Sequence, residues 1–338
     1  MTTIYLATGD VLAIVRRRGE GWRVTLALEG SPTQCVAIDP LRPERVNCGT
    51  FGRGLWRSED AGTSWRSAGE GIPHAEVMSV AVSRAERTGD HGVLWVGTEP
   101  SAVFRSEDGG QTWVERPALR DLPSAPTWSF PPRPWTHHVR WIAPDAVVPE
   151  RLFVGIELGG VMRSLDGGRT WEDRKPRSQH DAHTLAVHPL APGRVYEAAG
   201  GGYAESLDGG ATWRRADRGL EHHYLWSLAV DAADPDTIVV SAAGSPGEAH
   251  DPSVAESTIY RRSGDGPWEE VREGLPSPRG KRVAVVAANE GERRVFYATR
   301  DTEVYRSADA GLTWERLSIT WPDGYRPPAV RGMVVAEN

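Results

Sequence analysis

The chain has 338 residues, of which 39% are apolar and 25% are charged, and its formal net charge is −7. Lys and Arg are scattered along it, which excludes the basic stripe that follows a nucleic-acid backbone. The first residues lack the basic segment of a secretory leader, and no apolar run reaches membrane-spanning length. We therefore expect a soluble, cytoplasmic protein that contacts neither nucleic acid nor membrane. The 37 Gly and 25 Pro indicate short strands joined by turns.

A short motif recurs along the chain at a fairly regular spacing. Five clear copies read RSEDAGTSW, RSEDGGQTW, RSLDGGRTW, ESLDGGATW and RSADAGLTW, and two reduced copies read VRRRGEGW and RRSGDGPW. The closing tryptophans of successive copies are 42 to 58 residues apart, which is the repeat length of a β-propeller blade. These tryptophans are Trp22, Trp65, Trp113, Trp171, Trp213, Trp268 and Trp314.

Each repeat predicts four short strands, which we name A to D from the centre of the ring outward. An apolar A strand such as CVAIDP or SLAVD precedes a B strand such as RVNCGT or TIVVSA and a C strand such as GLWRS or EVYRS. The D strand begins at the tryptophan of the motif. The predicted blades are residues 1–30 with 325–338, then 31–72, 73–121, 135–178, 179–220, 221–275 and 276–323.

The two ends of the chain predict that the ring is closed. The first repeat opens with TIYLAT, which matches the B strands of the other repeats, and so lacks an A strand. The C-terminal segment VRGMVVAEN matches the A strands and supplies the missing one, which removes a free sheet edge. The predicted fold is all-β: one domain, a seven-bladed β-propeller of four-stranded antiparallel blades.

The repeated motif itself is interpreted as a structural turn. In Ser-x-Asp-x-Gly-x-Thr-Trp, the hydroxyl and carboxylate oxygens can bond backbone amides, and the glycines accept positive φ. A catalytic role would require at least five equivalent active sites around one ring. The aspartates interpreted as structural are Asp60, Asp108, Asp166, Asp208 and Asp309.

The motif resembles the Asp box, or bacterial neuraminidase repeat, and the resemblance covers essentially the whole chain. Asp-box propellers include sialidases, xyloglucan-cleaving glycosidases, sortilin-type receptors and the photosystem II assembly factor, so the resemblance implies a fold rather than one activity. Sialidases of this group are six-bladed and carry an Arg-Ile-Pro motif that does not occur here. Their catalytic residues therefore cannot be carried over. The xyloglucan enzymes use a cleft between two propellers, whereas this chain predicts one.

The two cysteines, Cys35 and Cys48, lie on neighbouring predicted strands of one sheet. Their number and spacing fit neither a disulfide framework nor a metal site. We expect two buried, reduced thiols, with a cross-strand disulfide as the alternative.

The candidate functional face is the one opposite the Asp-box turns. Those turns join C to D strands, so they share one face of the ring with the A to B turns, and the B to C loops and D to A connections form the other face. Two long insertions fall on that other face, one a D to A connection at residues 121–135 and one a B to C loop at residues 242–257. Long loops gathered on one face commonly build a binding site.

Alignment of the A strands places seven side chains at the channel mouth on this face, a mixture of charged, imidazole and aromatic groups. Such groups are costly there unless a ligand, water or ion satisfies them. They are Arg331, Gln34, Met78, His138, His183, Trp226 and Arg282. Six histidines also gather on this face, whereas His188 is expected in an A to B turn with a structural role. The nearby candidates are Arg53, Glu76, Glu99, His137, Glu157, His180, Asp181, Tyr203, His222, His223, Tyr224, Arg300 and Asp301.

Three chemistries remain open for this face. A glycoside hydrolase needs a pair of carboxylates, which Glu157 and Asp181 could supply, with His183 as a third catalytic candidate. The substrate-binding candidates for such a small-molecule or glycan pocket are Arg53, Arg282, Arg331, Gln34, Trp226, Tyr224 and Tyr203.

The second chemistry is a divalent transition-metal centre of His138, His183 and Glu157, with His180 or His223 as further ligands for Fe, Mn or Zn. The third is a non-catalytic scaffold for a protein or peptide, in which Arg53, Arg282 and Arg331 would contact anions. The aromatic residues Trp128, Phe130 and Trp135 are expected to be exposed, either as a lid or as a contact surface.

Overall fold

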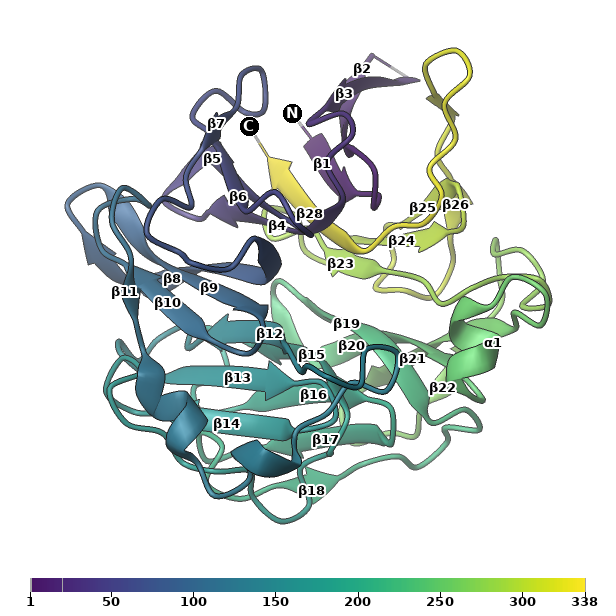
Figure 1. The fold of residues 1–338 in the computed structure, drawn as a ribbon. Helices are drawn as coiled ribbons and strands as arrows, with labels where there is room; N and C mark the ends of the chain where they lie inside the picture. The colour runs from purple at the N-terminus through teal and green to yellow at the C-terminus, as the bar shows by residue number, and fades with distance from the viewer. Residues whose placement is uncertain (1, 20, 338) are drawn as a thin grey trace.

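The computed structural model describes residues 2–19 and 21–337 of the chain. These residues form seven sheets arranged as the blades of a ring (Figure 1). The chain is an all-β, seven-bladed β-propeller, as the repeat predicts. Within the described ranges, no helix is both long and apolar enough to cross a membrane.

The first four blades run in chain order from the N-terminus. Blade 1 contains, from the channel outward, β28 (Gly332–Glu337), β1 (Thr2–Ala7), β2 (Leu12–Arg18) and β3 (Gly21–Ala27), and β27 (Ile319–Thr320) pairs in parallel with β3. Blade 2 contains β4 (Thr33–Asp39), β5 (Arg42–Thr50), β6 (Leu55–Ser58) and β7 (Arg66–Ser67). Blade 3 contains β8 (Glu76–Thr88), β9 (His91–Glu99), β10 (Val103–Ser106) and β11 (Val114–Glu115). Blade 4 contains β12 (Val139–Pro144), β13 (Leu152–Ile156) and β14 (Gly160–Ser164), and its outermost strand is reduced to the bridge Arg163↔Glu172.

The last three blades complete the ring, and three short helices lie in connections. Blade 5 contains β15 (Ala182–Val187), β16 (Val195–Ala199), β17 (Gly202–Ser206) and β18 (Arg214–Arg215). Blade 6 contains β19 (Tyr224–Asp231), β20 (Asp234–Ala243), β21 (Ser257–Ser263) and β22 (Glu269–Val271). Blade 7 contains β23 (Val286–Ala288), β24 (Phe296–Arg300), β25 (Glu303–Ser307) and β26 (Glu315–Arg316). The helices are η1 (Pro117–Asp121), η2 (Ala125–Thr127) and α1 (Pro246–His250).

The ring is closed by the C-terminal strand. β28 pairs antiparallel with β1, with Leu6 opposite Met333, and the two ends of the chain lie side by side in Figure 1. Each innermost strand contacts the next around the channel, in the order β28, β4, β8, β12, β15, β19, β23 and back to β28. This confirms the closure expected from the two ends of the chain. Because β28 pairs with β1, the innermost strand of the N-terminal segment is not left as an open sheet edge.

Apolar side chains hold adjacent blades together face to face. Phe153 and Val161 of blade 4, for example, pack in one cluster with Leu185 and Ala204 of blade 5. The β-branched and aromatic side chains of the strands are therefore buried in the interfaces between adjacent blades.

The turns formed by the repeated Ser-x-Asp motif, called the box turns below, repeat one set of hydrogen bonds. In blade 5, the Ser206 hydroxyl donates to Asp208 Oδ1 and accepts the backbone N–H of Gly210, each at 2.8 Å. Asp208 also accepts the backbone N–H of Thr212 at 2.9 Å and its hydroxyl at 2.7 Å. The same bonds recur at Asp60, Asp108, Asp166 and Asp309. These carboxylates are therefore used to hold turns, as expected.

Several of these turns also bind the preceding blade. Arg163 of blade 4 donates to the carbonyl of Gly209 at 2.7 Å, and Arg261 of blade 6 donates to the carbonyl of Ala310 at 2.6 Å. Both carbonyls lie directly after a box aspartate. Each such turn therefore stabilises its own hairpin and also bonds its blade to the preceding blade.

The two cysteines lie on neighbouring strands and are not joined to each other, and the expectation that both are buried holds for Cys48 but not for Cys35. Cys48 of β5 lies opposite Val36 rather than opposite Cys35. Cys48 is buried, whereas Cys35 is only half-buried and lies at the wall of the central channel.

Candidate functional site

A cavity of about 690 Å³ lies on the face opposite the box turns. B to C loops, D to A connections and the first residues of A strands build its wall. Both long insertions take part, through Phe130 to Arg133 and through Pro246 and His250. We call this hollow the site cavity, and it is lined by Gly9, Pro32, Gln34, Phe51, Met78, Phe130, Pro131, Pro132, Arg133, His138, Arg140, Glu157, Leu158, Asp181, Tyr224, Trp226, Pro246, His250 and Arg331.

The first insertion is an anchored wall rather than a loose lid. Trp128 was expected to be exposed, but it is only 6% exposed and packs in a core cluster with Leu119 and Leu122. Its indole N–H donates to the Ser124 hydroxyl at 3.0 Å, and that hydroxyl donates to Asp173 at 2.5 Å. Trp128 therefore fixes the insertion, whereas Trp135 is 79% exposed as expected.

Five A strands carry a β-bulge at equivalent depth, and the bulged residues shape the channel mouth. The pairing registers skip Gln34, Met78, Arg140, His183 and Trp226. A bulge inserts one unpaired residue, whose side chain does not follow the alternation between the two faces of the sheet. It can therefore direct that side chain toward a site. Four of these five line the site cavity, and the fifth, His183, lies buried beneath it.

This register corrects the sequence alignment at two blades. In blade 4 the residue equivalent to Gln34 and Met78 is Arg140, two positions after the expected His138. In blade 7 the pair Val286↔Ala298 puts Val285, not Arg282, at that depth. The blade 4 error is a shift of two residues, which preserves the inside and outside alternation of a strand, whereas the blade 7 error is a shift of three. His138 still lines the cavity from the position preceding β12.

Three predicted catalytic residues meet at the floor of the cavity. Glu157 follows β13, Asp181 precedes β15, and His183 is the bulged residue of β15. Each offers one oxygen or nitrogen atom, and these three atoms lie within 4.8 Å of one another. Two adjacent blades thus bring together groups that are 26 residues apart in the chain, from 157 to 183.

The tautomer of His183 follows from its contacts. Its Nδ1 lies 2.6 Å from the carbonyl oxygen of Leu225, which can only accept, so Nδ1 carries a proton. Its Nε2 is buried without a hydrogen-bond partner among the described residues and lies 3.4 Å from Asp181 Oδ2. The free nitrogen therefore points to the carboxylates. Asp181 Oδ1 in turn accepts the backbone N–H of Leu158 at 3.3 Å.

Glu157 is held in its ionised form. Burial alone would raise its pKa, but a 2.9 Å hydrogen bond from His138 Nε2 and the charges of His138, His183 and Arg140 lower the pKa to about 2. His138 lies between two carboxylates, since its Nδ1 is 3.4 Å from Glu99 Oε2. Burial alone would lower the pKa of His138, but the hydrogen bonds to Glu157 and Glu99 outweigh it and raise the pKa above its usual value.

Aromatic rings form two walls of the cavity. On one side Trp226 lies against His250 and His183, with ring centroids 4.5 and 4.9 Å away, and Arg140 stacks on its face at 4.4 Å. Burial, followed by the charges of His183 and Arg140, lowers the pKa of His250 to about 4, so this imidazole is neutral near pH 7. Tyr224 donates or accepts a 3.2 Å hydrogen bond with His250.

The opposite wall combines two phenylalanines with an arginine. Arg133 lies over the rings of Phe51 and Phe130, at 5.0 and 4.6 Å, and its Nε and Nη2 donate to the two carboxylate oxygens of Glu99. Neither Phe51, Arg133, Arg140 nor His250 was among the candidates from sequence. The bulge in β12 and the α1 segment of an insertion place the last two, and neither feature has a signature in the repeat.

The remaining predicted residues divide into those at the cavity and those away from it. Arg331 lines the cavity, and within the described residues its guanidinium makes no hydrogen bond or ion pair. Arg282 lies in an adjoining hollow, where it pairs with Asp301 at 3.3 Å. Arg53 is exposed on the loop after β5 and is not part of the lining described above.

Tyr203 is not brought to the cavity. It is fully buried between blades 5 and 6, and its hydroxyl donates to Glu205 at 3.0 Å. Arg300, His137 and His188 are also held by protein groups: Arg300 bonds Ser257, His137 bonds the Ser101 hydroxyl, and His188 donates to the carbonyl of Asp231 at 2.9 Å. His180 and His223 are exposed on the rim.

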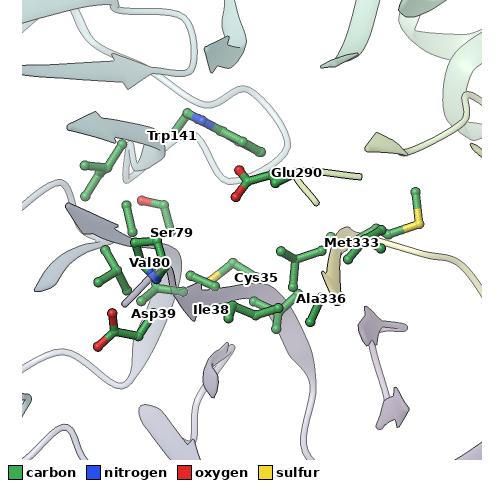
Figure 2. Close-up of a pocket in the computed structure, with 18 of the residues that line it drawn as sticks. Cys35, Ile38, Asp39, Ser79, Val80, Trp141, Glu290, Met333 and Ala336 are labelled. Carbon is green, nitrogen blue, oxygen red and sulfur yellow. The ribbon is translucent and has the colours of Figure 1, made fainter. Parts of the chain in front are cut away.

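The site cavity continues into the central channel. A second hollow of about 440 Å³ shares Gln34, Met78, Arg140 and Arg331 with it. Figure 2 shows part of this lining, in which Cys35, Val80, Trp141 and Met333 come from four different A strands around one open space. Toward the box face, Arg84 and Glu290 form an ion pair at the channel wall.

A scan against protein families finds no match for the chain. Among curated proteins, the chain is 23% identical over 259 residues to a probable oligoxyloglucan-reducing end-specific xyloglucanase of Neosartorya fischeri. The match covers 72% of this chain and 27% of that protein, so the chain spans about a quarter of the length of this relative.

Solved structures share the fold at low identity. A GH74 enzyme of Niastella koreensis superposes with a TM-score of 0.66 and 14% identity, over 94% of this chain and 52% of that one. YCF48 bound to D1 peptide superposes with a TM-score of 0.58 and 17% identity, over 85% of this chain and 82% of that one. The WD40 repeats of RRP9 give a TM-score of 0.58 and 11% identity, over 97% and 87%. Likeness at these identities shows the propeller fold alone.

Proposed function

We propose that the site cavity binds a carbohydrate and that Glu157 and Asp181 act in its cleavage, as in a glycoside hydrolase. The observation that carries this proposal is that aromatic faces and a pair of carboxylates line one cavity of about 690 Å³. That volume falls in the range of about 300–1,000 Å³ that is typical of small-ligand sites. The apolar face of a sugar ring packs on aromatic rings, while its hydroxyls bond charged groups.

The distance between the two carboxylates favours one class of glycosidase geometry over the other. Oxygens of Glu157 and Asp181 lie within 4.8 Å of each other, which is shorter than the roughly 6.5–9.5 Å of inverting glycosidases. The spacing is nearer the roughly 5–5.5 Å between the carboxyl groups of retaining glycosidases. His183 Nε2 is the third atom at that point.

The comparisons favour this reading over other hydrolytic chemistries. The curated relative is a probable xyloglucanase, and one of the structures with the higher TM-scores is a GH74 enzyme. We propose in addition that the repeated turns are Asp boxes and that the chain is an Asp-box propeller, and the five equivalent hydrogen-bond sets support this proposal.

The test is a screen of oligosaccharides with the purified chain, read by ligand-observed NMR for binding and by release of new reducing ends for cleavage. We expect at least one sugar to bind, and we expect Glu157→Gln to reduce cleavage by at least about 100-fold while the sugar still binds. Arg53→Gln, on the exposed loop outside the cavity, is the matched control and should keep both signals. Cleavage that survives in Glu157→Gln contradicts the assignment of this residue.

A second candidate function is a scaffold for a peptide or protein. It is favoured by the extent of the likeness to YCF48, which spans 82% of that chain and so matches a whole peptide-bound propeller rather than half of an enzyme. The exposed Trp135 would then contact the partner, together with Arg331, whose guanidinium makes no hydrogen bond or ion pair among the described residues. This function predicts that Trp135→Ala loses a partner in a pull-down while Glu157→Gln retains it.

A further inference from the structure

We propose that Glu157, Asp181 and His183 bind a divalent transition-metal ion at the floor of the site cavity. Their ligand atoms lie within 4.8 Å of one another, on two adjacent blades. The inference does not depend on the proposed carbohydrate chemistry, because the affinity for a metal ion is measured without any sugar.

His183 provides the independent observation. A buried nitrogen without a hydrogen-bond partner costs free energy unless an ion or a proton satisfies it. The side chain of His183 is fully buried, and its Nε2 is such an atom among the described residues. Because Nδ1 donates to the carbonyl of Leu225, the lone pair of the neutral imidazole is on Nε2, which faces Asp181 Oδ2 at 3.4 Å. A backbone carbonyl on the second nitrogen is the arrangement that metal-binding histidines commonly have.

The two carboxylates are fixed in a similar way, each by one oxygen. Oε2 of Glu157 accepts the hydrogen bond of His138, and Oδ1 of Asp181 accepts the N–H of Leu158. Oδ2 of Asp181 is left facing His183 at 3.4 Å. Outer groups of this kind orient ligands before an ion arrives, and their loss typically lowers metal affinity about 10- to 100-fold.

The donor set selects the class of ion. Two carboxylates and one imidazole suit Mn, Fe, Co or Zn, whereas Ca and Mg prefer oxygen ligands alone. The two negative charges match a divalent ion. Glu157 and Asp181 both line the site cavity, so the open positions of the ion would face the ligand space, where they could hold a water or a ligand hydroxyl.

This set differs from the metal centre expected from sequence. His138 was predicted as a ligand, but its Nε2 is engaged with Glu157, so it orients a ligand instead of providing one. Asp181 takes its place. His180 and His223, the further ligand candidates, lie exposed on the rim and outside the three-residue cluster.

The experiment uses the full chain, stripped with a chelator and dialysed, and titrated with Mn²⁺, Co²⁺ and Zn²⁺ in separate calorimetric runs. We expect one equivalent to bind, and we expect the visible absorption of bound Co²⁺ to report its coordination. Asp181→Asn should weaken binding by at least tenfold, and His183→Gln should do the same. His223→Gln is the matched control, because it removes an exposed histidine of the same face, and it should bind as the parent does.

Folding is checked for each variant by circular dichroism, and Asp181→Asn keeps the test valid if His183→Gln does not fold, since Asp181 is partly exposed. His138→Gln should bind one equivalent with an affinity reduced about 10- to 100-fold. Absence of stoichiometric uptake by the parent overturns the proposal. So does a folded Asp181→Asn that binds as tightly as the parent, or a His223→Gln that loses binding to the same extent. Sugar binding in the earlier screen is unaffected by any of these negative results.

Discussion

Asp208 and Asp181 both belong to blade 5, one on each face of the ring, and their carboxylates are used in different ways. Asp208 accepts hydrogen bonds from its own turn through both oxygens, and the same bonds recur in four other blades. Asp181 accepts one bond, from Leu158, and turns its second oxygen toward His183 and the site cavity. Five equal copies stabilise hairpins, while one unrepeated carboxylate next to an unsatisfied nitrogen is available for a ligand. The difference separates a structural carboxylate from one that we propose to be functional within one blade.

The largest expected effect comes from making the same substitution at both positions. Asp181→Asn should reduce cleavage of a carbohydrate found in the screen by at least about 100-fold, because it removes a charge at the reacting end of the cavity. Its melting temperature should stay close to that of the parent, since few bonds hold this carboxylate. Asp208→Asn should do the reverse, with a lower melting temperature and unchanged kcat/KM. The measurements are kcat/KM and a thermal scan on each purified variant.

Equal losses of activity in the two variants, at matched folded fractions, would remove the distinction between the faces. A loss of activity in Asp181→Asn that only follows a loss of folded protein would have the same meaning.

The same contrast explains how much the sequence could predict. The face with the repeated turns can be predicted from the sequence, because each motif indicates one turn. The seven copies also predict the number of blades and the closure by β28. The cavity face is not repeated, so its geometry depends on features with no local signature. The alternation of side chains with a period of two placed Gln34 and Met78 at the correct depth of their strands. It cannot distinguish two registers that differ by two residues, so His138 was expected where Arg140 lies.

Aromatic residues in insertions show the second limit of the sequence. Trp128, Phe130 and Trp135 occur within eight residues, yet the first is core, the second lines the cavity and the third is exposed. The aromatic composition indicates that this loop packs against the rest of the protein. Which of the three rings is buried depends on tertiary contacts, such as the hydrogen bond from Trp128 to Ser124. In the same way, the meeting of Glu157 with Asp181 needed two blades to be placed side by side.

A smaller effect is expected from the buried hydroxyl of a box. Ser206 is 1% exposed and accepts the backbone N–H of Gly210. Ser206→Ala leaves that buried N–H unsatisfied, so we expect the free energy of unfolding to fall by about 1–3 kcal/mol. The exposed Thr212 also bonds Asp208, and Thr212→Val should cost less than about 0.5 kcal/mol because water replaces its hydroxyl. Urea unfolding of both variants measures the ratio, and equal costs would mean that burial of the serine does not matter.

The smallest effect is a pH dependence that belongs to the box face. Hydrogen bonds from the hydroxyl and N–H of Thr212 lower the pKa of Asp208 to about 2, below its value of about 3.9 in an unfolded chain. Between these values the unfolded state binds more protons, so the stabilisation from this carboxylate is complete above about pH 4 and is lost as pH falls toward about 2.

Asp208→Asn lacks this titrating group. Its melting temperature should therefore lie below that of the parent at about pH 6, by roughly a few degrees, and the two curves should converge as the pH approaches about 2. Thermal unfolding followed by circular dichroism over this range tests it. A gap that stays constant at every pH would show that the asparagine fails for a reason other than lost charge, such as the geometry of its amide in the turn. Convergence would instead show that the box stabilises the propeller through ionised carboxylates, whose oxygens are occupied by hydrogen bonds within each turn and are not available to a ligand.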